Sequence, residues 1–181
     1  NEASVAGKIS NHAHFWENEL QASPFVLGMV KRGYSLPFVR RPASFYAPNN
    51  QSSLRHPEFV TTAINELLKD GCIKEVESMP FVCNPLTVAE GEKLRLVLDL
   101  RHVNEHLEVK KFKYENLKTV ADIFEKDFTF GTFDLRHGYH HIPIAEEDQK
   151  YLGFAWTFPD GRTRFFVFLV LPFGLASACY A

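Results

Sequence analysis

The sequence predicts an α+β domain, because helix-like and strand-like patterns are mixed along the chain without strict alternation. Three patterns support this prediction: a helical apolar face in residues 57–69, and pairs of strands in residues 86–100 and 154–170. The chain has 181 residues, of which 45% are hydrophobic, so it is long enough to form one domain with its own core.

Residues 1–56 are expected to form an N-terminal arm or lead-in. Its first 50 residues are predicted to be irregular, apart from a short helix at 15–20, because four prolines interrupt them: Pro24, Pro37, Pro42 and Pro48. Residues 20–57 contain no acid and five cations: Lys31, Arg32, Arg40, Arg41 and Arg55. Such a patch can follow a phosphate backbone, and a solvated surface is an equally good explanation.

Residues 57–69 are predicted to form a helix, because apolar pairs recur every four positions: Phe59/Val60, Ala63/Ile64 and Leu67/Leu68. Pro57 suits the first helical turn, and Gly71 suits the C-terminal cap. A strand is predicted to follow at residues 72–76.

Residues 86–89 and 94–100 are predicted to form a hairpin across Glu90-Gly91-Glu92-Lys93. In the second strand one face is apolar (Leu94, Leu96 and Leu98) and the other carries Arg95, Val97, Asp99 and Arg101. Two arginines and one acid on a face are compatible with an anion-binding surface. Considered alone, the strand favours the other explanation, a polar outer face on which Asp99 forms an ion pair.

The last third of the chain is predicted to contain a helix at 116–125, a strand at 128–133 and a helical turn at 146–151. Strands at 154–158 and 164–170 are expected to pair across the turn signal Pro159-Asp160-Gly161. Considered alone, Asp134 at the end of the 128–133 strand is a turn or cap residue more often than a metal ligand.

The composition narrows the class of protein. Three cysteines without a CxxC spacing make a disulfide framework or a zinc ribbon an unfavoured explanation and predict a reducing, intracellular (cytoplasmic or nuclear) location. The apolar run at 165–171 is far shorter than the ~20 residues of a membrane helix, so no membrane partner is expected. Because the chain starts without Met and stops inside an apolar stretch, we expect a fragment of a longer protein.

Four segments, taken together and in order, resemble the first half of a reverse transcriptase: NPLTVAEGEKLRLVLDLRHVN, FTFGTFDLRHGYHHIPI, KYLGFAW and FLVLPFGLASA. The resemblance covers residues 57–181 and implies the fingers and part of the palm of a right-hand polymerase fold. Residues 14–38 resemble the lead-in of retrotransposon polymerases of the tyrosine-recombinase (DIRS-like) group, and a Ty3/gypsy-like element is the other candidate.

The resemblance implies roles for particular residues. Asp134 matches the first catalytic aspartate, and it would bind Mg²⁺ together with the backbone carbonyl of Leu135. Arg95 matches the fingers arginine that holds the triphosphate of the incoming nucleotide. Lys93 is the best candidate for a second phosphate contact, since Val88, Ala89 and Glu90 stand where the family often has lysines. Tyr139 matches the bulky residue that excludes a ribose 2′-OH.

Phe173 and Gly174 match the segment that lies against the template–primer and the nascent base pair. The implied reaction is the addition of dNTPs to a primer 3′-OH on an RNA or DNA template, with two Mg²⁺ ions. The family's next motif, Tyr-x-Asp-Asp, does not occur in this chain, so the chain by itself is expected to be inactive.

Other interpretations remain open. A decayed element would leave a non-catalytic protein that binds nucleic acid. An RNA-dependent RNA polymerase shares the palm chemistry, although Tyr139 argues against it. A purely structural α+β domain would bind neither nucleotide nor Mg²⁺. A zinc site at His137, His140 and His141 is not expected, because no spaced partner joins them.

Overall fold

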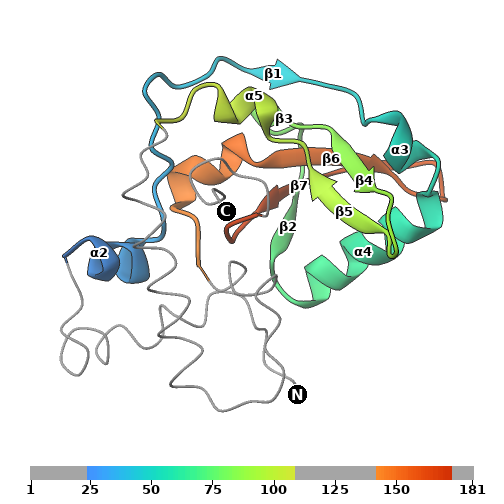
Figure 1. Cartoon of the computed structure of the whole chain (residues 1–181), viewed down its shortest axis with the longest axis horizontal. Helices are drawn as coiled ribbons and strands as arrows, with labels where there is room; N and C mark the ends of the chain where they lie inside the picture. Colours follow the sequence, from blue (N-terminus) through green and yellow to red (C-terminus); the bar gives the residue numbers. More distant parts are fainter. Residues whose placement is uncertain (1–23, 109–141, 173–181) are drawn as a thin grey trace, which may run out of the picture.

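A computed structural model of the chain describes residues 24–108 and 142–172. Figure 1 shows the arrangement of the helices and strands in this part of the chain. In chain order they are α2 (Pro24–Arg32), β1 (Phe45–Tyr46), α3 (Gln51–Leu54), α4 (Pro57–Lys69), β2 (Ile73–Val76), β3 (Val82–Cys83), β4 (Leu86–Ala89), β5 (Arg95–Leu98), α5 (Arg101–Asn104), the 3₁₀ helix η3 (Glu146–Tyr151), β6 (Gly153–Thr157) and β7 (Thr163–Phe168). The α+β prediction is confirmed.

The strands form two separate sheets. One has five strands in the order β1-β3-β6-β7-β2, and the other consists of β4 and β5 alone. In the larger sheet β6 pairs antiparallel with β7, from Gly153 opposite Val167 to Thr157 opposite Thr163. Both of these central strands therefore have partners on both edges, which leaves the short β1 and the strand β2 at the borders.

Helix α4 packs its apolar face onto this sheet, as its spacing predicts. Val60 and Ile64, four residues apart on the helix, are fully buried. The indole N–H of Trp156 in β6 donates a hydrogen bond of 3.1 Å to the hydroxyl of Thr61. The helix has the predicted bounds, and Gly71 just beyond its end has a φ of 72°, a left-handed conformation that favours glycine.

The predicted hairpins and the helical turn are also confirmed, with small shifts at their ends. β4 and β5 pair antiparallel, as do β6 and β7, and η3 occupies the predicted residues 146–151. The second strand of the first hairpin is shorter than predicted, because the chain turns into α5 after Leu98 and Arg101 begins that helix. The predicted elements at 15–20, 116–125 and 128–133 lie outside the described residues.

The prediction of an irregular chain over residues 24–32 is wrong, because these residues form helix α2. Pro24 occupies the first position of the helix, where the backbone N–H that proline lacks would have no partner within the helix. Gly33, with a φ of 84°, follows the end of the helix. The rest of the described arm packs onto the domain: Tyr34 and Leu36 are buried in the core, and β1 borders the larger sheet. The domain boundary at residue 56 remains a prediction.

Candidate functional site

The β4–β5 hairpin has one apolar and one polar face, as its register shows. Leu86 lies opposite Leu98, and Val88 lies opposite Leu96; Leu86, Val88 and Leu98 are buried. Thr87 opposite Val97 and Ala89 opposite Arg95 form the other face. Because side chains alternate along a strand, burying the leucines requires Arg95 to face away from the core.

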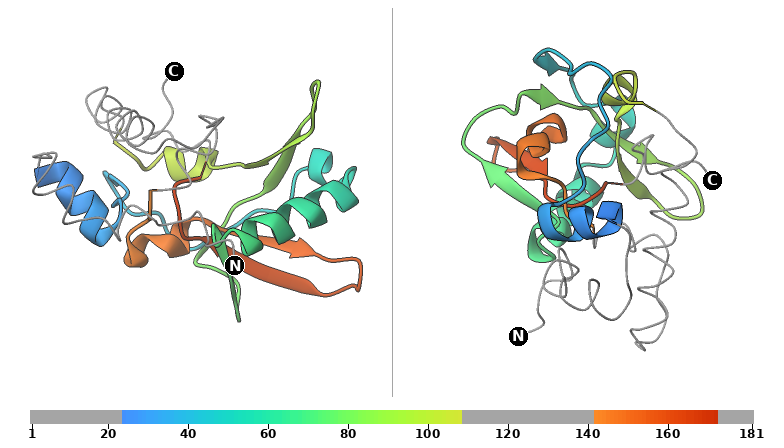
Figure 2. Two further views of the ribbon diagram at one scale, coloured as in Figure 1. Left: turned by 90° about the horizontal axis from the view of Figure 1, so that it is seen from below. Right: turned by 90° about the vertical axis from the view of Figure 1, so that its left-hand side faces the viewer.

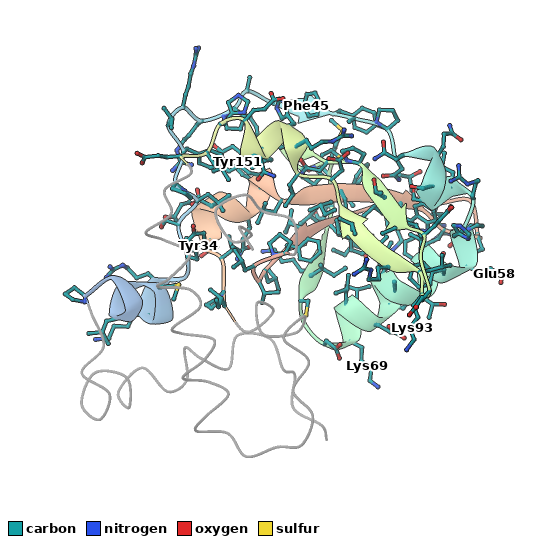
Figure 3. The ribbon with its side chains drawn as sticks, in the orientation of Figure 1. Tyr34, Phe45, Glu58, Lys69, Lys93 and Tyr151 are labelled. Carbon is teal, nitrogen blue, oxygen red and sulfur yellow. The ribbon has the colours of Figure 1, made fainter. Side chains whose placement is uncertain are left out.

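Lys93 and Arg95 are both exposed on this hairpin. Figure 3 shows Lys93 near the loop end of the hairpin. Within residues 24–108 and 142–172, neither side chain forms an ion pair or a hydrogen bond with another residue. Cations that form no ion pair among the described residues are available to bind an anion from solution.

Arg101, the second arginine of the predicted anion-binding face, is already paired. Its guanidinium donates to both carboxylate oxygens of Asp99, at 2.6 Å to Oδ2 and 2.9 Å to Oδ1, and its side chain is 83% exposed. This contact, together with the backbone N–H of Arg101 and the amide of Asn50, outweighs partial burial and lowers the pKa of Asp99. The interpretation with a paired Asp99 is therefore correct for Arg101, and Arg95 remains unpaired within the described residues.

A pocket of about 440 Å³ lies between the hairpin and its neighbours. Its lining includes Asn50, Thr87, Asp99, Arg101 and Asn104. The Asn50 amide donates to the hydroxyl of Thr87 and, at 3.2 Å, to Asp99. The pocket thus offers an acid, an arginine and amide groups beside the polar face of the hairpin.

The outer edge of β4, which β5 does not pair, is held by residues 49–52. The backbone N–H of Leu86 donates to the side chain of Asn49 at 2.9 Å, and its carbonyl accepts the N–H of Asn50 at 3.0 Å. The N–H of Val88 donates to the hydroxyl of Ser52 at 3.1 Å. Short polar side chains before a helix readily form such bonds to a neighbouring backbone, and here they fix the base of the hairpin.

The basic patch predicted at residues 20–57 is partly neutralised. Arg41 donates to the buried carboxylate of Asp148 at 3.0 Å, and Arg55 donates to Glu90 at 2.9 Å. Asp148 also accepts the backbone N–H of Leu36 at 2.8 Å, so it fastens the arm to η3. The sequence analysis missed Asp148, because nothing in an acidic turn such as EEDQKY marks which acid will be buried.

The remaining predicted site residues, Asp134, Leu135, Tyr139, Phe173 and Gly174, lie outside the described residues. Among residues 24–108 and 142–172, no group of three or more histidines, cysteines and acids is arranged to hold a metal ion. Burial raises the pKa of both Cys72 and Cys83 to about 11, so these thiols are poor nucleophiles. No helix in the described segments is long and apolar enough to cross a membrane.

Comparison with known proteins places the chain among relatives of retroelement polyproteins. No family model matches it. It is 33% identical over 128 residues to the retrovirus-related Pol polyprotein from transposon gypsy of Drosophila melanogaster, covering 67% of this chain and 12% of that protein. It is 30% identical over 126 residues to a putative enzymatic polyprotein of Cassava vein mosaic virus, covering 65% of this chain and 18% of that protein.

A solved structure is also similar: the foamy viral protease-reverse transcriptase dRH in complex with double-stranded DNA. It has a TM-score of 0.46 and 23% identity, covering 79% of this chain and 22% of that chain. The chain spans less than a fifth of the two polyproteins named above. It is homologous to a segment of retrotransposon and viral Pol polyproteins, which confirms the resemblance to a retroelement polymerase at this level.

Proposed function

We propose that this relative of retroelement Pol polyproteins is the fingers and first palm segment of a reverse transcriptase. It would take part in template-directed addition of dNTPs to a primer 3′-OH. The observation that carries the proposal is the β4–β5 hairpin, which presents Arg95 and Lys93 without a partnering acid among the described residues. An exposed guanidinium fork at the start of a strand suits the binding of a triphosphate.

The pocket beside the hairpin supports a nucleic-acid partner. Its Asn50, Asn104 and Arg101 side chains offer hydrogen-bond groups of the kinds that proteins use on sugar and phosphate. The acid Asp99 neutralises Arg101 locally, so this surface is polar rather than strongly cationic. We expect a template strand here and the triphosphate near Arg95.

The proposed chemistry depends on Asp134, which would hold two Mg²⁺ ions together with the carbonyl of Leu135 and carboxylates from a later Tyr-x-Asp-Asp motif. The ions would supply charge stabilisation at the reacting phosphate. Tyr139 would select deoxynucleotides by steric exclusion of a 2′-OH. Phe173 and Gly174 would lie against the template–primer.

Primer extension on poly(rA)·oligo(dT) with Mg²⁺ tests this function, in a protein that continues past Ala181 through the downstream coding sequence. We expect dTTP incorporation by this protein and none by its Asp134→Asn variant. Arg95→Ala should raise the KM for dTTP about 10- to 100-fold, because a charge-assisted contact to phosphate is lost. Lys93→Ala should raise it less, because a lysine makes a single point contact.

Matched controls separate a site effect from a general loss of charge. Arg162 and Lys69 are also exposed cations, and they lie on the β6–β7 turn and at the end of α4. Arg162→Ala and Lys69→Ala should leave the KM unchanged. An inert longer protein that still binds template–primer would instead indicate a non-catalytic remnant, and equal effects of Arg95→Ala and Arg162→Ala would remove Arg95 from the site.

A further inference from the structure

The loop end of the β4–β5 hairpin is tied to the rest of the fold by one acid. Glu90, the first residue after β4, accepts a hydrogen bond from the Arg55 guanidinium at 2.9 Å. Nε2 of His56 lies 3.0 Å from the same carboxylate oxygen. These two contacts, that of Arg55 being the stronger, hold the pKa of Glu90 below its usual value. Both partners lie in the connection between α3 and α4.

This contact continues a series along β4. The backbone groups of Leu86 and Val88 form hydrogen bonds with Asn49, Asn50 and Ser52. Glu90 comes two residues after Val88, so the contacts fall on every second residue along this edge. The first contacts fix the base of the hairpin beside the core. At the end that carries Lys93, Leu94 packs against the core, and Glu90 adds the ion pair, whereas Glu92 and Lys93 form no hydrogen bond or ion pair within the described residues.

The place of the hairpin in the fold explains why the contact of Glu90 affects the position of the loop. Among the strands that the structure describes, the hairpin is a separate two-stranded sheet, so none of the other described strands holds its loop in place. In the left view of Figure 2 it extends away from the β6–β7 hairpin, with α4 between the two. A two-stranded ribbon is marginal by itself, and its free end can swing unless something outside the ribbon holds it.

We propose that Glu90 is a positioning residue for nucleotide binding. Its ion pair with Arg55 and its contact with His56 hold the loop end of the hairpin and so set where Lys93 and Arg95 meet a polyphosphate. The inference rests on the proposed function, because it assigns those two cations to the triphosphate. It gives the acid at position 90 a task other than phosphate binding, which its charge would oppose.

The solvent exposure of the Glu90–Arg55 ion pair determines which property of the protein should change when the pair is removed. The side chains of Arg55 and Glu90 are 59% and 49% exposed. An ion pair in water contributes little to the stability of a whole fold and is weakened by salt. Loss of the pair should therefore change the position and mobility of the hairpin loop, and leave the unfolding midpoint unchanged.

The first measurement is amide hydrogen exchange of this chain, by mass spectrometry, at the same pH for every variant. In Glu90→Gln the peptide covering residues 88–96 should exchange about two- to fivefold faster than in the wild type, while α4 does not change. Glu92→Gln is the matched control, because it removes the same charge from the same loop without removing the contact. The charge swap Glu90→Arg with Arg55→Glu should restore the slow exchange.

The second measurement is the affinity of the same proteins for inorganic tripolyphosphate at low salt. Removing an acid makes the net charge of the protein less negative. Glu90→Gln and Glu92→Gln should therefore gain the same affinity for tripolyphosphate from that change alone. We expect Glu90→Gln to bind about two- to fivefold more weakly than Glu92→Gln, and this difference should disappear at high salt.

The outcomes separate the two proposals. Exchange in residues 88–96 that is the same in Glu90→Gln and Glu92→Gln overturns the positioning role, whatever the affinities. Faster exchange in Glu90→Gln without any tripolyphosphate binding by the wild type overturns the proposed function and the role built on it. Faster exchange together with weaker binding, both reversed by the charge swap, supports the positioning role.

Discussion

The two antiparallel hairpins of this chain differ in what surrounds them. β6 and β7 lie inside the five-stranded sheet, so each has a second strand on its other edge. Within the described part of the chain, β4 and β5 pair only with each other, and side chains of Asn49 and Ser52 bind the outer edge of β4. Both hairpins contribute to one core, the β4–β5 hairpin through Leu86, Val88 and Leu98, but only the β6–β7 hairpin lies inside the larger sheet.

Their arginines show the same difference. Arg164 in β7 donates two hydrogen bonds of 2.8 Å to Glu75 in the neighbouring strand β2, which lowers the pKa of Glu75. Its guanidinium also lies 4.5 Å from the ring centre of Phe158. Arg95 in β5 has no such partner among the described residues. Arg164 is thus paired within the fold, whereas Arg95 is available for the phosphate contact that we propose for it.

The largest expected effect comes from deleting core volume in the β6–β7 hairpin. Phe166 is fully buried and stacks against Phe154 with 5.2 Å between ring centres. Phe166→Ala should lower the free energy of unfolding by about 3–5 kcal/mol, measured by urea unfolding. Leu96→Ala in the β4–β5 hairpin, where the side chain is half-buried, should cost clearly less. Equal losses would mean that the half-buried Leu96 contributes as much to the shared core as Phe166, against the distinction drawn between the two hairpins.

A smaller effect should follow from releasing the arm from η3. Asp148 is 1% exposed and binds both the Leu36 N–H and Arg41. Asp148→Ala leaves a buried N–H without its acceptor, so it should cost about 1–3 kcal/mol in the same measurement. Glu147→Ala, at the exposed neighbouring position, should cost less than about 0.5 kcal/mol. If the two variants lose the same stability, Asp148 does not fasten the arm.

The sequence predicts best where one local pattern decides the structure. The pairs in residues 59–68 gave helix α4 with its correct bounds, and alternation with turn residues gave both hairpins. Alternation also placed Arg95 on the exposed face. The ion-pair partners of the arginines, in contrast, are far away in the sequence: Asp148 lies 107 residues from Arg41, and Glu90 lies 35 residues from Arg55. No spacing rule predicts them.

Helix α2 shows a different limit. Pro24 was interpreted as a helix breaker, although proline in the first turn is favourable. The predicted roles of Asp134, Leu135, Tyr139, Phe173 and Gly174 come from the resemblance to reverse transcriptases, and they remain predictions. Arg95 and Lys93 are the two proposed nucleotide contacts that the described structure positions on one element.

The smallest expected effect concerns the joint between the two regions. His102 lies in α5, directly after the β4–β5 hairpin, and its ring stacks on Phe45 of β1 at 3.7 Å between ring centres. Its Nε2 is buried without a partner among the described residues. Burial, and secondly the charge of His106, lower the pKa of His102, while Glu105 acts in the opposite direction.

This shift predicts that mild acid destabilises the fold. The pKa of His102 is lower in the folded state than in the unfolded chain. As the pH falls through the ordinary histidine pKa of about 6.5, the unfolded chain therefore binds more protons than the folded protein, and this favours unfolding. Urea midpoints should therefore fall between pH 7.5 and pH 5.5. His102→Phe keeps a ring on Phe45 and removes the titrating nitrogen, so its midpoint should fall less over the same range. An unchanged pH dependence in His102→Phe would assign the acid sensitivity to other groups and leave the stack as a joint that pH does not affect.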